Sequence, residues 1–123
     1  MREQRYPDEV FDAQVTLAGD ATVVAVSGEV DLETADRFNE ALRLAVQGGG
    51  GPVVVDLCRV AFMDSTGLHL LLNLLRRLTR QRRSLAIACE PAGVRRLFEL
   101  TRLDGTFTLY ESRDDAIAAL SVA

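Results

Sequence analysis

Two patterns of apolar and polar positions alternate along the chain. Short runs rich in β-branched residues are typical of strands, and longer segments with an apolar residue every three or four positions are typical of helices. Strands are predicted over residues 14–18, 22–27, 53–58, 84–89 and 106–110, and helices over residues 33–46, 68–80, 91–100 and 113–120. Gly28 is expected to end the second strand, and the glycines at 48–51 with Pro52 are expected to end the first helix.

The order of these elements, β-β-α-β-α-β-α-β-α, predicts an α/β fold. It favours a single domain over residues 12–120, with a small, mostly parallel mixed sheet and helices packed on it, and a frayed N-terminus over residues 1–11. The first strand can add antiparallel at an edge. The nearly all-apolar run at 53–58 suits a strand covered on both faces, and the leucines from Leu68 to Leu78 are expected to be core.

Charge is distributed unevenly, although the formal net charge is only −4. Residues 1–40 hold ten acidic side chains and three arginines, and the remainder holds eleven arginines and eight acids. This distribution argues against wholesale nucleic-acid binding and favours a basic or mixed protein partner.

Several other classes of protein are disfavoured by the sequence. No apolar run reaches the roughly 20 residues of a membrane span, and no apolar leader follows Met1, so a cytoplasmic protein is expected. Cys58 and Cys89 lie in apolar runs and are predicted to be reduced core thiols. With them and one histidine the chain cannot fill a structural zinc site without carboxylates, and neither a metal nor a cofactor is expected.

The most informative segment is Asp64-Ser65-Thr66-Gly67, which follows a buried strand and opens a helix. Ser65 is predicted to be the N-cap. Gly67 is a poor helix former, and the close approach of another chain's backbone is one reason for it to stand there. A helix N-terminus also stabilises a phosphate, and phosphorylation would add a charge of roughly −1.5 to −2. If the unmodified loop docks on a partner, that charge would disrupt the docking.

The candidate site residues also have plainer interpretations. Ser65 can be a cap and nothing more, and Asp31, like Thr34, can be a helix cap or turn residue. A hydrolase would pair Ser65 with His69 and need an orienting acid, Asp64 or Asp56, but no Gly-x-Ser-x-Gly elbow surrounds Ser65.

A cluster of arginines suggests nucleic-acid binding, and its members are at positions 76, 77, 80, 82 and 83. No aromatic residues that could stack on bases stand between them. Cations are also favourable at a helix C-terminus, which is the plainer interpretation.

Three segments together resemble one protein family. Gly-Glu-Val-Asp at 28–31, Val-Val-Asp-Leu at 54–57 and Phe-Met-Asp-Ser-Thr-Gly-Leu at 62–68 resemble the STAS domain family, and specifically the bacterial anti-sigma factor antagonists. The resemblance covers about residues 12–120. Cys58-Arg59 stands where members often have Ser-Gly, and His69 stands where a small residue is common.

The resemblance implies a non-enzymatic switch that works by partner switching. The unmodified antagonist would bind an anti-sigma factor that is also a serine kinase and so release the sigma factor. ATP-dependent phosphorylation of Ser65 would end the binding, and a PP2C-type phosphatase would restore it; Thr66 is the second-choice acceptor. The partner-binding residues implied are Asp31, Asp64, Ser65, Thr66, Gly67 and His69.

Two further expectations concern assembly. The free protein is expected to be a monomer that touches neither nucleic acid nor membrane. The alternative is a STAS scaffold subunit that does not switch, in a stress-sensing or lipid-transport complex.

Overall fold

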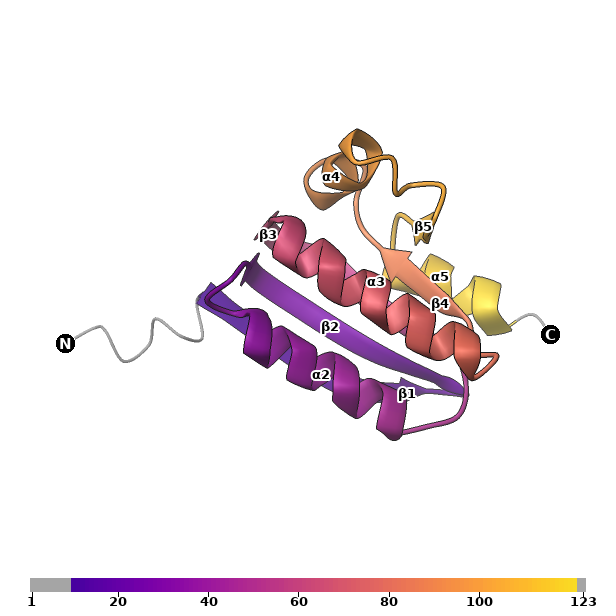
Figure 1. Ribbon diagram of the computed structural model, residues 1–123. Coiled ribbons are helices and arrows are strands. Elements are labelled where there is room, and N and C mark those ends of the chain that lie inside the picture. The colour runs from indigo at the N-terminus through magenta and orange to yellow at the C-terminus, as the bar shows by residue number, and fades with distance from the viewer. Residues whose placement is uncertain (1–9, 122–123) are drawn as a thin grey trace.

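The computed structural model describes residues 10–121 (Figure 1). Its strands are β1 (Phe11–Ala18), β2 (Ala21–Val30), β3 (Val53–Met63), β4 (Leu85–Ala88) and β5 (Thr108–Tyr110). Its helices are α2 (Ala35–Gln47), α3 (Ser65–Arg80), α4 (Val94–Leu100) and α5 (Arg113–Ser121). The predicted order of strands and helices is confirmed over this part of the chain.

The strands form one sheet in the order β1-β2-β3-β4-β5. β1 pairs antiparallel with β2, and every later pair is parallel, so the expected mixed sheet with an antiparallel edge strand is confirmed. Parallel neighbours need a crossover connection, and α2, α3 and α4 supply it in turn.

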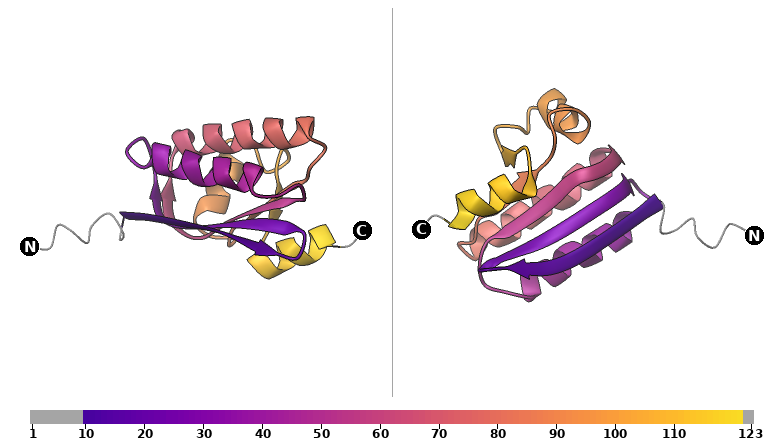
Figure 2. Two further views of the ribbon diagram at one scale, coloured as in Figure 1. Left: turned by 90° about the horizontal axis from the view of Figure 1, so that it is seen from below. Right: turned by 180° about the vertical axis from the view of Figure 1, so that it is seen from behind.

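Helices cover both faces of the sheet. α2 and α3 lie side by side on one face, and α5 lies on the other (Figure 2). The main core lies under α2 and α3, where Phe38, Leu71 and Leu74 pack with Val55 of β3. A smaller cluster joins Val54 and Ala86 to Ala116 of α5. The apolar run that begins β3 is therefore buried on both faces, as predicted, and the leucine stripe of α3 is core.

Gly28 does not end β2, contrary to the prediction. The strand continues to Val30, and its pairing with β3 shifts register on either side of Gly28. Gly28 has φ 93°, and a Cβ there would lie 2.2 Å from the carbonyl oxygen of Val10. Glycine is required because the backbone is left-handed and another backbone segment lies against it, which is typical of a bulge.

Two other boundaries differ from expectation. β3 runs five residues further, to Met63, because Arg59, Val60, Phe62 and Met63 still pair with β2. The fourth helix begins at Val94, because residues 91–93 form a turn that ends on Gly93 at φ 77°. The predicted C-terminal helix is confirmed: Ser112 Oγ accepts the Asp115 N–H at 3.1 Å.

Of the expected frayed segment, residues 1–9 lie outside the described residues. Phe11 belongs to β1; its side chain is buried and meets the Phe38 ring edge-on, with centroids 6.4 Å apart. The domain bounds 12–120 otherwise stay a prediction.

Both cysteines are free thiols, with Cys89 buried and Cys58 half-buried. Desolvation raises the pKa of Cys89 to about 11. Desolvation, with Asp56 nearby, raises the pKa of Cys58 to about 12. Both thiols are therefore protonated and poorly nucleophilic at neutral pH.

We expect Gly28→Ala to lower the free energy of unfolding by at least about 2 kcal/mol, because a Cβ would have to displace backbone in a left-handed conformation. Gly50→Ala is the matched control: a Cβ there meets nothing within 4 Å, and we expect a change of about 0.5 kcal/mol or less. Urea unfolding followed by circular dichroism measures both. Equal losses in the two variants would contradict this account of the bulge.

Candidate partner-binding site

Two loops meet where β2 and β3 end. The strands are parallel, Val30 stands beside Met63, and the Asp64 N–H donates to the Val30 carbonyl oxygen at 3.2 Å. Asp31 and Asp64 therefore leave neighbouring strand ends at the same edge, from which α2 and α3 begin (Figure 1). The structure thus gathers the predicted residues Asp31 and 64–69 at one end of the sheet.

Asp31 closes the turn that precedes α2. Its Oδ1 accepts the N–H of Glu33 at 3.0 Å and of Thr34 at 3.2 Å. Thr34, which is buried, holds the turn from within: its hydroxyl donates to the Glu29 carbonyl oxygen at 2.9 Å and accepts the Asp31 N–H at 3.0 Å. Asp31 is thus a turn residue, and Thr34 occupies the N-cap position without a side-chain capping bond. A contact of Asp31 with a partner stays a prediction.

Asp64, and not Ser65, is the N-cap of α3. Asp64 has extended backbone, and its Oδ1 accepts the Thr66 N–H at 2.9 Å. Its carbonyl oxygen accepts the Gly67 N–H at 3.1 Å. Ser65 is the first helical residue; it is exposed, and its side chain makes no hydrogen bond with any residue of the described chain. The correction leaves the hydroxyl of Ser65 accessible, whereas a capping hydroxyl would be occupied.

Gly67 is needed by contacts within this chain. It is buried, and a Cβ there would lie 2.7 Å from Cγ of Met63 and 2.9 Å from Cγ1 of Val30. Close packing of the first turn of α3 on the two strand ends is therefore sufficient reason for this glycine, and the approach of another chain's backbone stays a prediction. Gly67 thereby positions its neighbours Thr66, which is half-buried, and His69, which is exposed one turn later.

The catalytic alternative needs an acid that orients His69, and no acidic side chain of residues 10–121 forms a hydrogen bond or ion pair with it. Asp56 is buried in β3, where Oδ2 accepts Nε of Arg113 at 2.9 Å and Oδ1 accepts the Cys58 N–H at 3.0 Å. It lies eight positions before Asp64, roughly 25 Å along an extended strand. The Asp64 carboxylate caps α3 instead of orienting an imidazole. Residues 10–121 thus contain no Ser-His-Asp arrangement around Ser65, and they hold no group of three or more potential metal ligands.

The two loops of the site and the residues next to them in the chain are rich in acidic side chains. Five carboxylates come from the two loops, their strand ends and the start of α2: Glu29, Asp31, Glu33, Asp36 and Asp64. A cluster of five arginines lies in the second half of α3, which is about 24 Å long for its 16 residues, and in the loop after it: Arg76, Arg77, Arg80, Arg82 and Arg83. One of them is structural: Arg83 donates to the carbonyl oxygens of Gly51 at 2.8 Å and Val46 at 2.9 Å.

Two exposed apolar side chains at the site were not predicted. Leu32, between Asp31 and Glu33, is 79% exposed, and Phe62, which pairs with Glu29 across the strands, is 50% exposed. Leu32 carried a signal in the sequence, because an isolated leucine between two acids in a loop has no core to join. Phe62 carried none, because it lies inside the apolar run 60–63, whose first and last members are buried.

Within residues 10–121, no helix has the length and apolar character needed to cross a bilayer.

Comparisons of the sequence and of the fold with known proteins point to the same family. The family model described as "Mlab, STAS domain" matches residues 13–111. The anti-sigma-B factor antagonist of Staphylococcus aureus is 38% identical over 80 residues, which are 65% of this chain and 74% of that protein. The crystal structure of an anti-sigma factor antagonist from Mycobacterium paratuberculosis superposes with a TM-score of 0.82 at 31% identity, covering 91% of this chain and 95% of the other.

A more distant likeness concerns the fold alone. The phosphorylated form of the Bacillus cell fate determinant SpoIIAA superposes with a TM-score of 0.65 at 21% identity, covering 88% of this chain and 98% of the other.

We expect Asp64→Ala to lower the free energy of unfolding by about 0.5–2 kcal/mol, the usual cost of losing an N-cap. Ser65→Ala should change it by about 0.5 kcal/mol or less, because the hydroxyl caps nothing. Chemical denaturation of the two variants and of the unmodified protein shows whether Asp64 or Ser65 is the N-cap of α3. A larger loss for Ser65→Ala would show that Ser65 is the cap after all.

Proposed function

Because the chain belongs to the STAS domain family and shares it with anti-sigma factor antagonists, which are non-enzymatic regulators, we propose that it switches a sigma factor on by binding an anti-sigma factor. In this proposal the unmodified protein binds an anti-sigma factor that is a serine kinase, and the sigma factor is released. The binding surface consists of the loop at Asp31 and the start of α3. The protein acts in the cytoplasm, as a monomer when free.

One observation carries the choice of Ser65 as the switch. Ser65 is exposed at the first position of α3 with an unoccupied hydroxyl, while Asp64 beside it does the capping. A kinase can therefore modify Ser65 without dismantling the helix start. Thr66 is half-buried, with its N–H held by Asp64, and is the poorer acceptor.

The switch acts at short range. A basic partner suits the acidic surroundings, so long-range attraction alone would survive one more negative charge. In the docked state, however, the hydroxyl of Ser65 lies against the partner without water, and a group carrying about −1.5 to −2 charges cannot be desolvated there without a dedicated cation. The neighbouring carboxylates of Asp64 and Asp31 add repulsion at the same point. Phosphorylation therefore breaks the contact.

The chemistry of the cycle belongs to the partners. The kinase transfers the γ-phosphoryl group of ATP to Oγ of Ser65: the new O–P bond forms, the bond to ADP breaks, and the hydroxyl proton leaves with a base of the kinase. A PP2C-type phosphatase then hydrolyses the phosphoserine with water and restores the hydroxyl. That the same fold exists in a phosphorylated form, in SpoIIAA, supports only its tolerance of the modification.

We expect unmodified protein and Ser65→Ala to capture the same ATP-binding kinase from the lysate of the host, and Ser65→Asp to capture at least about tenfold less. Thr66→Asp is the matched control for an added carboxylate one position away, and it should keep more of the binding. Adding Mg²⁺ and ATP to the captured complexes should release the kinase from the unmodified protein and not from Ser65→Ala.

Equal capture of the same proteins by all variants, with no effect of ATP, would contradict the switch. It would favour the alternative, a STAS subunit that is a fixed part of a stress-sensing or lipid-transport complex.

A further inference from the structure

A small hollow lies beside the end of β3, next to α4. Its volume is about 160 Å³. The residues that line it are uncharged and come from the strand end, from α4 and from the turn before α4: Ala61, Phe62, Met63, Gly93, Val94 and Leu97. A cavity of roughly 150 Å³ with apolar walls is large enough to bind benzene. The hollow therefore has room for one aromatic or aliphatic side chain from another protein.

The hollow exists because β4 is shorter than β3. β4 ends at Ala88, which pairs with Asp56, so residues 57–63 of β3 extend beyond it. The short helix α4 lies against this part of β3 instead of a strand. Neighbouring strands are only about 4.8 Å apart, whereas a helix with its side chains is about 10 Å across. The helix cannot approach β3 as closely as a strand would, and space remains between them.

Met63 connects the hollow to the proposed switch. It lines the hollow, and it also packs against the first turn of α3, where a Cβ on Gly67 would lie 2.7 Å from its Cγ. Phe62 stands three positions before Ser65, at most about 11 Å along the chain. In Figure 1 the start of α3 lies between α4 and the loop that precedes α2. The hollow is thus continuous with the surface around Ser65.

Large apolar side chains are exposed on both sides of the start of α3. Leu32, in the loop before α2, is 79% exposed, and Phe62, in the wall of the hollow, is 50% exposed. In protein interfaces a few large side chains supply most of the binding energy, and the contacts around them exclude water. A partner that covers Leu32 and Phe62 would therefore also remove water from Ser65.

The charges near this surface have both signs. Acidic residues stand on either side of Leu32 in the chain. On the other side, α4 carries Arg96, which is exposed, and Arg95, which pairs with Glu99 at 3.6 Å. Net charge therefore does not select what enters the hollow. Its apolar walls set the chemistry of the occupant, and its continuity with the surface around Ser65 indicates the protein that supplies it.

We propose that an apolar side chain of the anti-sigma factor, aromatic or of the size of leucine, enters the hollow between Phe62 and α4 when the two proteins bind. The inference rests on the proposed function, because the partner is the one that binds around Ser65. The inserted side chain anchors the docked state. The exclusion of water around it makes a phosphate on Ser65 costly to bury.

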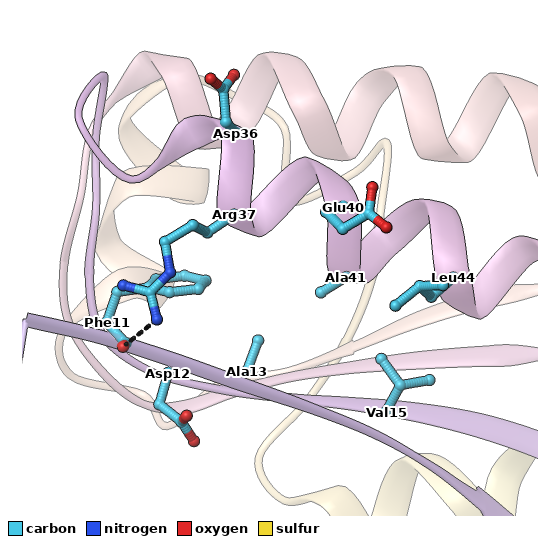
Figure 3. A pocket seen from close by; sticks show the side chains of 9 residues that line it. All are labelled: Phe11, Asp12, Ala13, Val15, Asp36, Arg37, Glu40, Ala41 and Leu44. Carbon is cyan, nitrogen blue, oxygen red and sulfur yellow. Dashed lines mark hydrogen bonds between the residues drawn. The ribbon is translucent and has the colours of Figure 1, made fainter. Parts of the chain in front are cut away.

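The test measures the affinity of purified variants for the kinase that the unmodified protein captures, in the absence of ATP. Phe62→Ala removes one wall of the hollow, and we expect it to raise the Kd at least about tenfold. Leu44→Ala is the matched control and should change the Kd by less than about twofold. Leu44 is 45% exposed and lies further along α2, in the groove beside β1 (Figure 3).

A second variant fills the hollow and removes no apolar contact. Ala61 is exposed and lines the hollow, so Ala61→Leu should occupy part of its volume and raise the Kd about tenfold. Ala118→Leu is its control, because Ala118 is also exposed but belongs to α5 on the other face of the sheet (Figure 2). Urea unfolding of all four variants separates a loss of binding from a loss of folding.

Phe62→Ala and Ala61→Leu that bind like the unmodified protein, while Ser65→Asp binds at least about tenfold more weakly, would overturn this inference and leave the proposed switch standing. Capture of no kinase by the unmodified protein would overturn the proposed function, and the inference with it. A dimer of the free protein that Phe62→Ala dissociates, seen by light scattering, would assign the hollow to a second copy and overturn the inference as well.

Discussion

Parallel pairing between β2 and β3 places both loops of the site. Because the two strands run the same way and end together at Val30 and Met63, the chain leaves them on one side of the sheet. The Asp64 N–H still donates to Val30, so α3 cannot begin before Ser65. An antiparallel arrangement would have sent Asp31 and Asp64 to opposite ends of the molecule.

Gly67 and Asp64 meet the structural needs of the first turn of α3, so the hydroxyl of Ser65 is not used in the described chain. The absence of a side chain at Gly67 lets the first turn of α3 lie on Met63 and Val30. Asp64 satisfies an amide of that turn, so the adjacent serine has no structural duty in the described chain. A regulatory site needs this separation of tasks, since a modification that also removed a helix cap would destabilise the fold it is meant to control.

Much of the architecture could be predicted because it rests on local patterns. Alternating strand and helix signals were enough for the α/β class, the element order and the edge position of β1. The glycines were harder: Gly28 resembles a strand end until Val10 is known to lie against it, and Gly67 is explained by Met63 and Val30. Such reasons are tertiary contacts, which no local pattern contains.

The same limit applies to the site. Asp64 and Ser65 are equally good caps by residue type, and only the last hydrogen bond of the strand decides between them. Arg83 looked like one of a cluster of surface cations, but its partners, the carbonyl groups of Val46 and Gly51, are more than 30 positions away.

The most direct test of the central claim is to map phosphate on the protein isolated from its host, by tandem mass spectrometry of peptides that span residues 60–75. The account predicts a phosphopeptide with the phosphate on Ser65, lost on treatment with a PP2C-type phosphatase. Phosphate on Thr66 with Ser65 unmodified, or no phosphate on Ser65 in any growth phase, would contradict it.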